Sequence, residues 1–170
     1  MIKQLCTSIQ LVISDIDGVM TPGSINYSSD DEIKTFNVQD GAGIKYLQRA
    51  GIEIAIITGR TSLSLQRRCE ELGITDLIQG AKNKLEPYQK LLSDKNLTDN
   101  QVCYIGDDFP DILPLKASGF AVAPANALCE VKLQCDYITS SAGGDGAFRE
   151  LAMLIIKHQG KWNDIYARYR

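Results

Sequence analysis

Short apolar runs alternate with longer amphipathic stretches along most of the chain. Runs of this length, bounded by polar or glycine-containing segments, are typical of strands that are buried on both faces of a sheet. Four strong candidates lie at 11–14, 53–57, 102–105 and 119–122, and two weaker ones lie at 77–79 and 135–138.

Apolar residues at helical spacing predict helices between these runs. The predicted helices cover Ile44–Arg49, Leu63–Leu72, Leu85–Ser93 and Ala147–His158. Gly51 and Gly73 follow the first two, and glycine is a common stop signal for a helix. Because strands alternate with helices, we expect one α/β domain over residues 1–170, with a mostly parallel sheet between two helical layers, as in Rossmann-like folds.

One segment, residues 24–37, interrupts this alternation. Residues that favour extended chain stand on both sides of the polar stretch Ser28–Glu32, a pattern that predicts a β-hairpin. The hairpin would follow directly after a pair of aspartates and would project over the carboxyl edge of the sheet. An ordinary edge hairpin without a covering role fits the pattern equally well.

Composition and charge indicate which classes of protein the chain can belong to. Apolar residues make up 44% of the chain and charged residues 23%, which is typical of a globular domain. The net charge is −3 and no basic stripe is visible, which argues against a nucleic-acid partner. The first residues show neither a signal-peptide layout nor an apolar span long enough to cross a membrane. We therefore expect a cytoplasmic protein without a membrane partner.

The cysteines and the single histidine limit the possible chemistry. The five cysteines are scattered and form no CxxC pair, which favours reduced thiols over a zinc or redox site. His158 lies near the end of the last predicted helix, where we expect a surface role. Catalysis is therefore expected to depend on carboxylates and lysine.

Two aspartates follow the first predicted strand. Asp15 and Asp17 are two positions apart, so they share one side of an extended chain. The carboxyl edge of an open parallel sheet is where ligands bind. Neighbouring carboxylates need a cation or a shared proton, and Mg2+ prefers oxygen ligands. These two residues therefore predict a cation site at this edge.

A second strand also leads into polar residues. Thr58, Gly59 and Arg60 come directly after the run at 53–57. Backbone N–H groups and a hydroxyl at such a position can hold a phosphate oxygen. Thr58 as the cap of the following helix is a structural alternative.

A lysine and a second acidic loop complete the set. Lys84 precedes the predicted helix that begins at Leu85, with Lys82 as the alternative lysine. The strand at 102–105 leads into the loop GDDFPD, which supplies Asp107, Asp108 and Asp111.

These four motifs, in this order, resemble those of the haloacid dehalogenase-like (HAD) phosphohydrolases. The resemblance implies that Asp15 is a nucleophile that forms an aspartyl-phosphate and that Asp17 is the general acid and base. It implies a Mg2+ ion held by Asp15, the backbone carbonyl of Asp17, and Asp107. Thr58 and Lys84 would bind the phosphoryl group and neutralise its charge.

Asp108 and Asp111 are expected to support this site. They would orient water, Lys84 or the acidic loop itself. Capping of the following helix is the alternative role for both residues.

Further segments resemble the capless HAD subfamily that includes the 3-deoxy-D-manno-octulosonate (KDO) 8-phosphate phosphatases. They are FNVQDG at 36–41, TGR at 58–60 with Arg68-Cys69, and GGDGAFRE at 143–150. The resemblance implies a fold without a cap domain and Mg2+-dependent hydrolysis of KDO 8-phosphate, in the biosynthesis of a lipopolysaccharide sugar. The substrate-binding residues that it implies are Asp17, Asn37, Val38, Gln39, Asp40, Gly41, Lys45, Thr58, Gly59, Arg60, Arg68 and Lys84.

Two of these residues suit the carboxylate of such a sugar. Arginine can donate two parallel hydrogen bonds to a carboxylate. Arg60 and Arg68 are eight positions apart, and on one helical stretch they would approach the same ligand. Relatives that act on a nine-carbon keto-deoxy sugar 9-phosphate have glutamate in place of Arg60, so Arg60 favours the eight-carbon substrate.

The resemblance also implies a homotetramer. In that subfamily the hairpins form a barrel and neighbouring subunits cover each active site in place of a cap. The C-terminal tail, which begins near residue 140, would use Gly143, Gly144 and Gly146 for flexibility and reach an adjacent site. A simple loop before the helix at 147–158 is the alternative.

Other functions stay open at this stage. One is a phosphatase for the nine-carbon analogue or for another sugar phosphate. A second is a non-catalytic HAD-like module that only oligomerises. A third is a receiver-like domain, against which the separate TGR and GDDFPD motifs argue.

Overall fold

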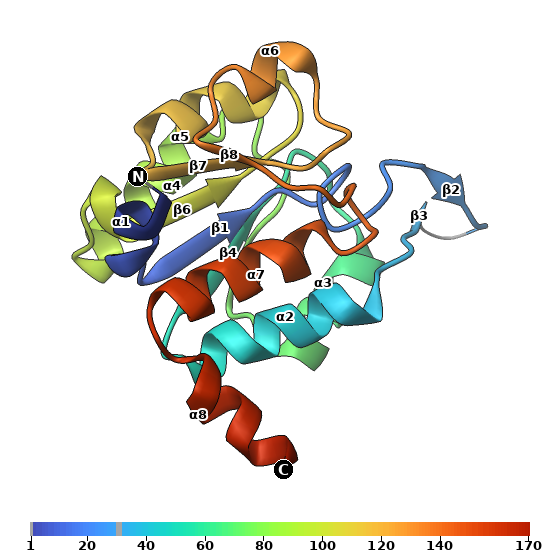
Figure 1. The fold of residues 1–170 in the computed structure, drawn as a ribbon. Coiled ribbons are helices and arrows are strands. Elements are labelled where there is room, and N and C mark those ends of the chain that lie inside the picture. Colours follow the sequence, from blue (N-terminus) through green and yellow to red (C-terminus); the bar gives the residue numbers. More distant parts are fainter. Residues whose placement is uncertain (1, 30–31) are drawn as a thin grey trace.

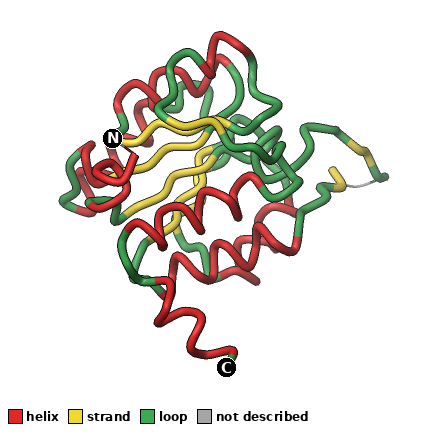
Figure 2. Tube along the Cα trace, in the orientation of Figure 1, coloured by secondary structure: helices red, strands yellow, loops and turns green. Residues whose placement is uncertain are grey.

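A parallel sheet of six strands runs through the centre of the computed structural model, which describes residues 2–29 and 32–170 (Figures 1 and 2). The strands are β1 (Leu11–Ser14), β4 (Glu53–Ile57), β5 (Asp76–Ile78), β6 (Val102–Ile105), β7 (Phe120–Ala123) and β8 (Tyr137–Ile138). Their order across the sheet is β5-β4-β1-β6-β7-β8, and all neighbouring strands are parallel. All six predicted strands are confirmed.

Helices cover both faces of the sheet, which confirms the three-layer α/β architecture (Figure 1). On one face lie α1 (Ile2–Thr7), α2 (Val38–Arg49), α3 (Leu63–Leu72), α7 (Ala147–His158) and α8 (Trp162–Tyr166). On the other face lie α4 (Leu85–Lys95), α5 (Ile112–Ala117) and α6 (Cys129–Lys132). The described residues also form three short 3-10 helices, η1 (Asp99–Gln101), η2 (Phe109–Asp111) and η3 (Ala167–Tyr169).

The strand sequences explain this layering. Alternate residues of a strand point to opposite faces, so Val12 packs against the α2 and α7 side while Ile13 packs against the α4 side. Both residues are fully buried, as are all four residues of β1. A strand with apolar residues on both faces is stable only when helices cover both sides.

One helix starts earlier than predicted, whereas α3 begins and ends at the predicted residues. Helix α2 begins at Val38, six residues before the predicted start, because the Oδ1 atom of Asn37 accepts a hydrogen bond of 2.7 Å from the backbone N–H of Gln39. The cap of α3 is Ser62 and not Thr58, whose side chain stays available at the end of β4. Helix α3 ends at Gly73, which adopts the left-handed conformation, as predicted.

The predicted hairpin is present, although its strands are short. Strand β2 (Asn26–Tyr27) pairs antiparallel with β3 (Glu32–Ile33). The predicted turn at 28–32 includes residues 30 and 31, which lie outside the described residues. Figure 1 shows the hairpin standing away from the sheet, on the side where α3 begins. Between them, residues 2–29 and 32–170 form no cap domain.

The glycine-rich segment before α7 packs against the first acidic loop. A Cβ atom on Gly143 would overlap the carbonyl oxygen of Gly18, and one on Gly144 would overlap the backbone of Thr21 and Pro22. The backbone N–H of Gly144 donates to the carbonyl of Val19 over 3.0 Å. Within this chain the segment is therefore a docked loop before α7, which corresponds to the simpler of the two expectations.

Among the described residues, no helix is both long and apolar enough to cross a membrane.

Candidate active site

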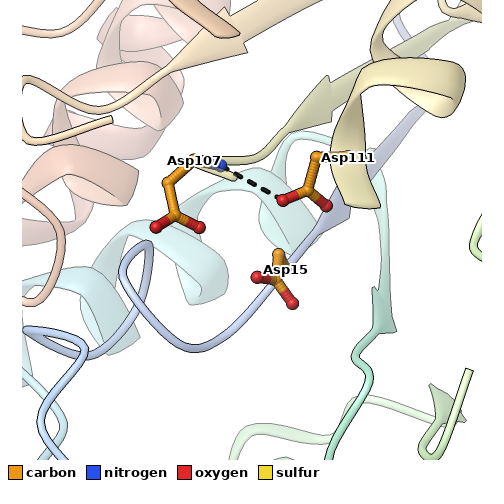
Figure 3. A group of neighbouring side chains, drawn as sticks. All are labelled: Asp15, Asp107 and Asp111. Carbon is orange, nitrogen blue, oxygen red and sulfur yellow. Dashed lines mark hydrogen bonds between the residues drawn. The ribbon is translucent and has the colours of Figure 1, made fainter. Parts of the chain in front are cut away.

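Three aspartates meet at the carboxyl edge of the sheet (Figure 3). Asp15 follows β1, whereas Asp107 and Asp111 come from the loop and 3-10 helix that follow β6. One carboxylate oxygen from each lies within 4.8 Å of the other two. Strands β1 and β6 are direct neighbours in the sheet, which is why two motifs more than 90 residues apart in sequence converge here.

Lys84 compensates this negative charge. Its Nζ atom lies 2.8 Å from Oδ1 of Asp15 and 2.8 Å from Oδ1 of Asp111, and its side chain is 4% exposed. It occupies the N-cap position of α4. The structure therefore distinguishes the two candidate lysines, because Lys82 is exposed while Lys84 joins the carboxylates.

Both carboxylate oxygens of Asp111 accept hydrogen bonds from other groups of the protein. Its Oδ1 atom also accepts a hydrogen bond of 2.7 Å from the Tyr104 hydroxyl, and its Oδ2 atom accepts from the backbone N–H groups of Asp107 and Asp108. The dashed line in Figure 3 marks the contact with Asp107. Asp111 thus orients Lys84 and the acidic loop, while Asp108 caps η2 through the backbone N–H of Phe109.

Burial and neighbouring negative charge raise the pKa of two carboxylates, those of Asp15 and Asp107. Burial, together with the charge of Asp111, raises the pKa of Asp15 to about 7 against the opposing effect of Lys84. Burial, together with Asp15 and Asp111, raises the pKa of Asp107 to about 7. Burial lowers the pKa of Lys84, but the two carboxylates beside it outweigh this effect and leave the pKa raised. The cluster carries more negative charge than one lysine balances.

The cluster forms one wall of a pocket of about 270 Å3. Its lining brings together the residues that follow three strands and the segment before α4. They are Asp15, Asp17, Thr58, Gly59, Arg60, Ala81, Lys82, Lys84, Asp107, Asp108, Pro110 and Asp111. All four predicted motifs therefore face one cavity.

Two residues of the hairpin segment, which the sequence motifs do not include, contact residues that line this pocket. The Nζ atom of Lys34 lies 2.5 Å from Oδ1 of Asp17 and 3.2 Å from Oε2 of Glu32. The other oxygen of Glu32 pairs with Arg60, which lines the pocket. The one sequence signal for this pair is that Glu32 and Lys34 are two positions apart and share one side of an extended chain.

The prediction that Arg60 and Arg68 lie on one helical stretch is wrong. Helix α3 begins at Leu63, so Arg60 belongs to the loop before it and Arg68 to the helix. Arg68 instead pairs with Glu71 over 3.1 Å and lies over the ring of Phe36 at 5.8 Å. It lines a separate exposed hollow together with Lys34 and Arg67.

The segment Asn37–Gly41 lies outside the pocket lining of its own chain. Asn37 caps α2 and donates to the carbonyl of Gly144 over 3.4 Å. Asp40 is buried and accepts from the backbone N–H of Arg149, which holds the start of α7. Gly41 leaves room for the Arg68 guanidinium, whereas Val38 and Gln39 are exposed.

Lys45 lies one turn further along α2 and donates to the carbonyl of Leu72 over 2.6 Å, at the end of α3. It is also absent from the lining of the pocket around Asp15.

Asn126 and Tyr104 are further residues that sequence reasoning missed. Asn126 donates to the carbonyl of Gly18 over 2.9 Å and accepts from the N–H of Gly143 over 2.5 Å, so it joins the first acidic loop to the glycine segment. Tyr104 lies within an apolar run of the sequence. The one signal for a role in the site was that its polar hydroxyl belongs to a buried strand.

Comparison with known proteins agrees with this geometry. Residues 30–119 match the family model for haloacid dehalogenase-like hydrolases. The chain is 41% identical to the 3-deoxy-D-manno-octulosonate 8-phosphate phosphatase KdsC of Haemophilus influenzae, over 94% of this chain and 89% of that protein. The KdsC protein of Escherichia coli K12 is also 41% identical, over 92% of this chain and 84% of its own length.

A solved structure matches nearly the whole chain. It is the 3-deoxy-D-manno-octulosonate 8-phosphate phosphatase of Moraxella catarrhalis in complex with a magnesium ion, a phosphate ion and KDO, with a TM-score of 0.97 and 39% identity over 99% of this chain and 98% of that one. The chain belongs to the haloacid dehalogenase-like hydrolases and, among them, to the family of the 3-deoxy-D-manno-octulosonate 8-phosphate phosphatases.

Proposed function

We propose that the chain hydrolyses KDO 8-phosphate to KDO and inorganic phosphate, in the biosynthesis of a lipopolysaccharide sugar. The observation that carries the proposal is the contact of Lys84 with Asp15 and Asp111 beside Asp107, in a pocket that also contains Thr58 and Asp17. Relatives with the same fold and about 40% identity carry this activity in their names.

In the first step, a carboxylate oxygen of Asp15 attacks the phosphorus atom. A bond forms between Asp15 and phosphorus, and the bond between phosphorus and the sugar oxygen breaks. The carboxyl group of Asp17 gives its proton to that sugar oxygen, so the sugar leaves as a neutral alcohol. Lys84 neutralises charge on Asp15 and the phosphoryl group.

In the second step, Asp17 acts as a base. Its carboxylate takes a proton from a water molecule, whose oxygen attacks the phosphorus of the aspartyl-phosphate. The bond between phosphorus and Asp15 breaks, which regenerates the Asp15 carboxylate and releases inorganic phosphate. The hydroxyl of Thr58 and the backbone N–H of Gly59, two residues of the pocket lining, would hold the phosphoryl oxygens during both steps.

The residues present fit a magnesium ion. The Oδ1 atom of Asp107 is buried and has no hydrogen-bond partner within the described part of the chain, and the pKa of Asp107 is raised, as expected of a carboxylate short of positive charge. Asp15, the backbone carbonyl of Asp17, and Asp107 would hold the ion, while Asp111 is occupied by protein donors. When bound, the ion neutralises charge on the phosphoryl oxygens and on the aspartates.

Substrate selectivity is assigned to two groups of residues. Arg60 lines the pocket and suits the sugar carboxylate. Arg68, Lys45 and the segment Asn37–Gly41 are proposed as substrate-binding residues from the resemblance to the family alone, because they lie outside the pocket lining of their own chain.

We also propose a homotetramer, in which neighbouring subunits cover the site of the single domain over residues 1–170. Exposed apolar side chains on the hairpin, namely Ile25, Tyr27 and Ile33, support an interface there. A sizing experiment at micromolar concentration tests this, and a monomer would contradict it. The cytoplasmic location rests on the buried free thiols of Cys6, Cys69 and Cys103.

Phosphate release from a panel of substrates tests the function. The panel comprises KDO 8-phosphate, the nine-carbon 9-phosphate and p-nitrophenyl phosphate, each with and without Mg2+ and with the Asp15→Asn variant. We expect a preference for KDO 8-phosphate that chelator and the substitution both abolish. A preference for the nine-carbon substrate would assign the chain to that activity. No metal-dependent release from any substrate would favour a non-catalytic oligomerising module.

A further inference from the structure

We propose that Lys34 is a positioning residue, which holds one carboxylate oxygen of Asp17 so that the other oxygen is presented for proton transfer. The inference rests on the phosphatase function proposed above, and it assigns to the base of the hairpin a part in protonation of the leaving sugar.

The two oxygens of Asp17 have different surroundings. Oδ1 receives the Nζ atom of Lys34 at 2.5 Å and the hydroxyl of Thr21 at 3.4 Å. Oδ2 is buried and has no hydrogen-bond partner among residues 2–29 and 32–170. The carboxylate is therefore anchored through one oxygen, while the second oxygen of this pocket-lining residue has no such partner in the described part of the chain.

Anchoring matters because the terminal torsion of an aspartate is soft. The carboxylate group rotates over a broad range unless a partner fixes it. A general acid must lie within hydrogen-bond distance of the atom that it protonates, so a rotated carboxylate loses efficiency even when the residue is intact. Lys34 supplies the partner that fixes this torsion in Asp17.

Lys34 is itself held in place. Its side chain is 4% exposed, and its Nζ atom is 3.2 Å from Oε2 of Glu32, whose side chain is 10% exposed. The side chain of Glu32 pairs with Arg60, and the backbone carbonyl of Glu32 accepts a hydrogen bond from the Ser64 hydroxyl. A buried lysine that contacts two carboxylates is compensated electrically, so it can serve as a rigid support.

Lys34 lies between the hairpin and the acidic loop after β1. It follows β3 directly, so the hairpin that projects from the sheet delivers it to the acidic loop after β1. The hairpin segment therefore contributes a side chain that contacts Asp17, a lining residue of the same chain's pocket, in addition to any role in contacts between copies.

A comparison of leaving groups separates positioning of Asp17 from a general structural role. The sugar oxygen of KDO 8-phosphate needs a proton as it leaves, whereas p-nitrophenolate leaves readily without one. The parameter kcat/KM reports the steps up to the first phosphoryl transfer, where Asp17 acts as the acid. A defect confined to this protonation therefore lowers kcat/KM for the sugar phosphate and spares the aryl phosphate.

The experiment measures kcat/KM of the full-length, Mg2+-loaded protein with both substrates. For Lys34→Met we expect a loss of about 100-fold with KDO 8-phosphate and of less than about threefold with p-nitrophenyl phosphate. Lys34→Arg, which keeps a cationic donor, should recover most of the activity on the sugar phosphate. Lys90→Met removes an exposed lysine that pairs with Asp94 and serves as the matched control, with unchanged kinetics.

Two further measurements complete the test. Lys34→Met should cause no additional loss on the sugar phosphate in an Asp17→Asn background, because both changes remove the same function. Thermal melting and sizing of each variant check that folding and assembly persist. Should Lys34→Met fail to fold, Lys34→Gln allows the same comparison with a neutral hydrogen-bond donor.

Equal losses on both substrates, no loss on either, or additive losses in the double variant would overturn the inference. If the wild-type protein hydrolyses neither substrate, the proposed function fails and the inference fails with it. An active wild type with equal losses in Lys34→Met overturns the inference alone.

Discussion

The ammonium group of Lys84 lies 2.8 Å from Oδ1 of Asp15, the residue proposed as the nucleophile. The same group lies 2.8 Å from Oδ1 of Asp111, which is fully buried. One cation therefore compensates two carboxylates in the interior, and stability and chemistry are coupled at this residue.

Replacement of Lys84 by methionine should affect both stability and catalysis. We expect the variant to lose about 3–5 kcal/mol of stability near pH 8, because two buried carboxylates lose their partner. Its kcat should fall by at least about 100-fold, because charge that develops at the phosphoryl group is no longer neutralised. Denaturant unfolding and phosphate release measure the two effects, with Lys90→Met as control. A Lys84→Met protein with wild-type turnover would exclude the assigned role.

The metal-free protein should become less stable as the pH rises from about 4 to about 7. Asp15 and Asp107 have folded-state pKa values of about 7, above the value of 3.8 for a free aspartate. The folded state therefore binds more protons than the unfolded state in this window, and stability falls with increasing pH. Mg2+ should raise the melting temperature far more at pH 8 than at pH 5.5, because it binds the ionised carboxylates.

Melting curves at both pH values, with Mg2+ or with chelator, test this prediction. The Asp107→Asn variant is the control, and it should lose most of the Mg2+ response and part of the pH dependence. An Mg2+ effect of equal size at pH 5.5 and pH 8 would contradict the assignment of the metal ligands.

Tyr104 and Asp111 should give graded effects. In Tyr104→Phe one hydrogen bond of 2.7 Å to Asp111 is lost while Lys84 remains, so we expect a destabilisation of about 1 kcal/mol and a small change in kcat. In Asp111→Ala, Lys84 loses one of its two carboxylate partners, and the N–H groups of Asp107 and Asp108 lose their acceptor. We expect a larger destabilisation, of about 3 kcal/mol, and a severe loss of kcat. Equal effects of the two changes would show that Asp111 does not organise the site.

A methyl group at Gly143 should disturb the first acidic loop. The added carbon in Gly143→Ala would overlap the Gly18 carbonyl, next to Asp17, so the loop has to shift. We expect a destabilisation of about 1–3 kcal/mol together with a loss of kcat. Gly160→Ala is the control, since that glycine has a left-handed backbone with open space around it and lies far along the chain from the site. That change should reduce stability by about 1 kcal/mol and leave kinetics unchanged.

The fold was predictable wherever hydrophobic pattern and length decide the element. The strands at 11–14 and 102–105 consist of apolar residues apart from Ser14, and both are present within the predicted bounds. The short helices α1, α5, α6 and α8 were missed because four to six residues provide at most about one and a half turns of periodicity. The start of α2 was placed too late because Gly41 and Gly43 weaken the helical signal after Asn37.

The site residues that come directly after a strand were predictable from the sequence. Asp15, Thr58 and Asp107 follow β1, β4 and β6, and parallel strands bring their carboxyl ends to one edge. Lys34, Asn126 and Tyr104 could not be assigned in this way. Their contacts depend on how the hairpin, a loop and a strand side chain pack in three dimensions. The spacing of residues in the sequence does not predict this packing.

The most direct test of the account is to trap the covalent intermediate. Mg2+-loaded protein is mixed with KDO 8-phosphate, quenched in acid within milliseconds and analysed by peptide mass spectrometry, with Asp15→Asn as the control. We predict the mass increase of one phosphoryl group on the peptide that contains Asp15, and its absence in the variant. Rapid phosphate release with no phosphorylated peptide, or phosphorylation of another residue, would contradict Asp15 as the nucleophile.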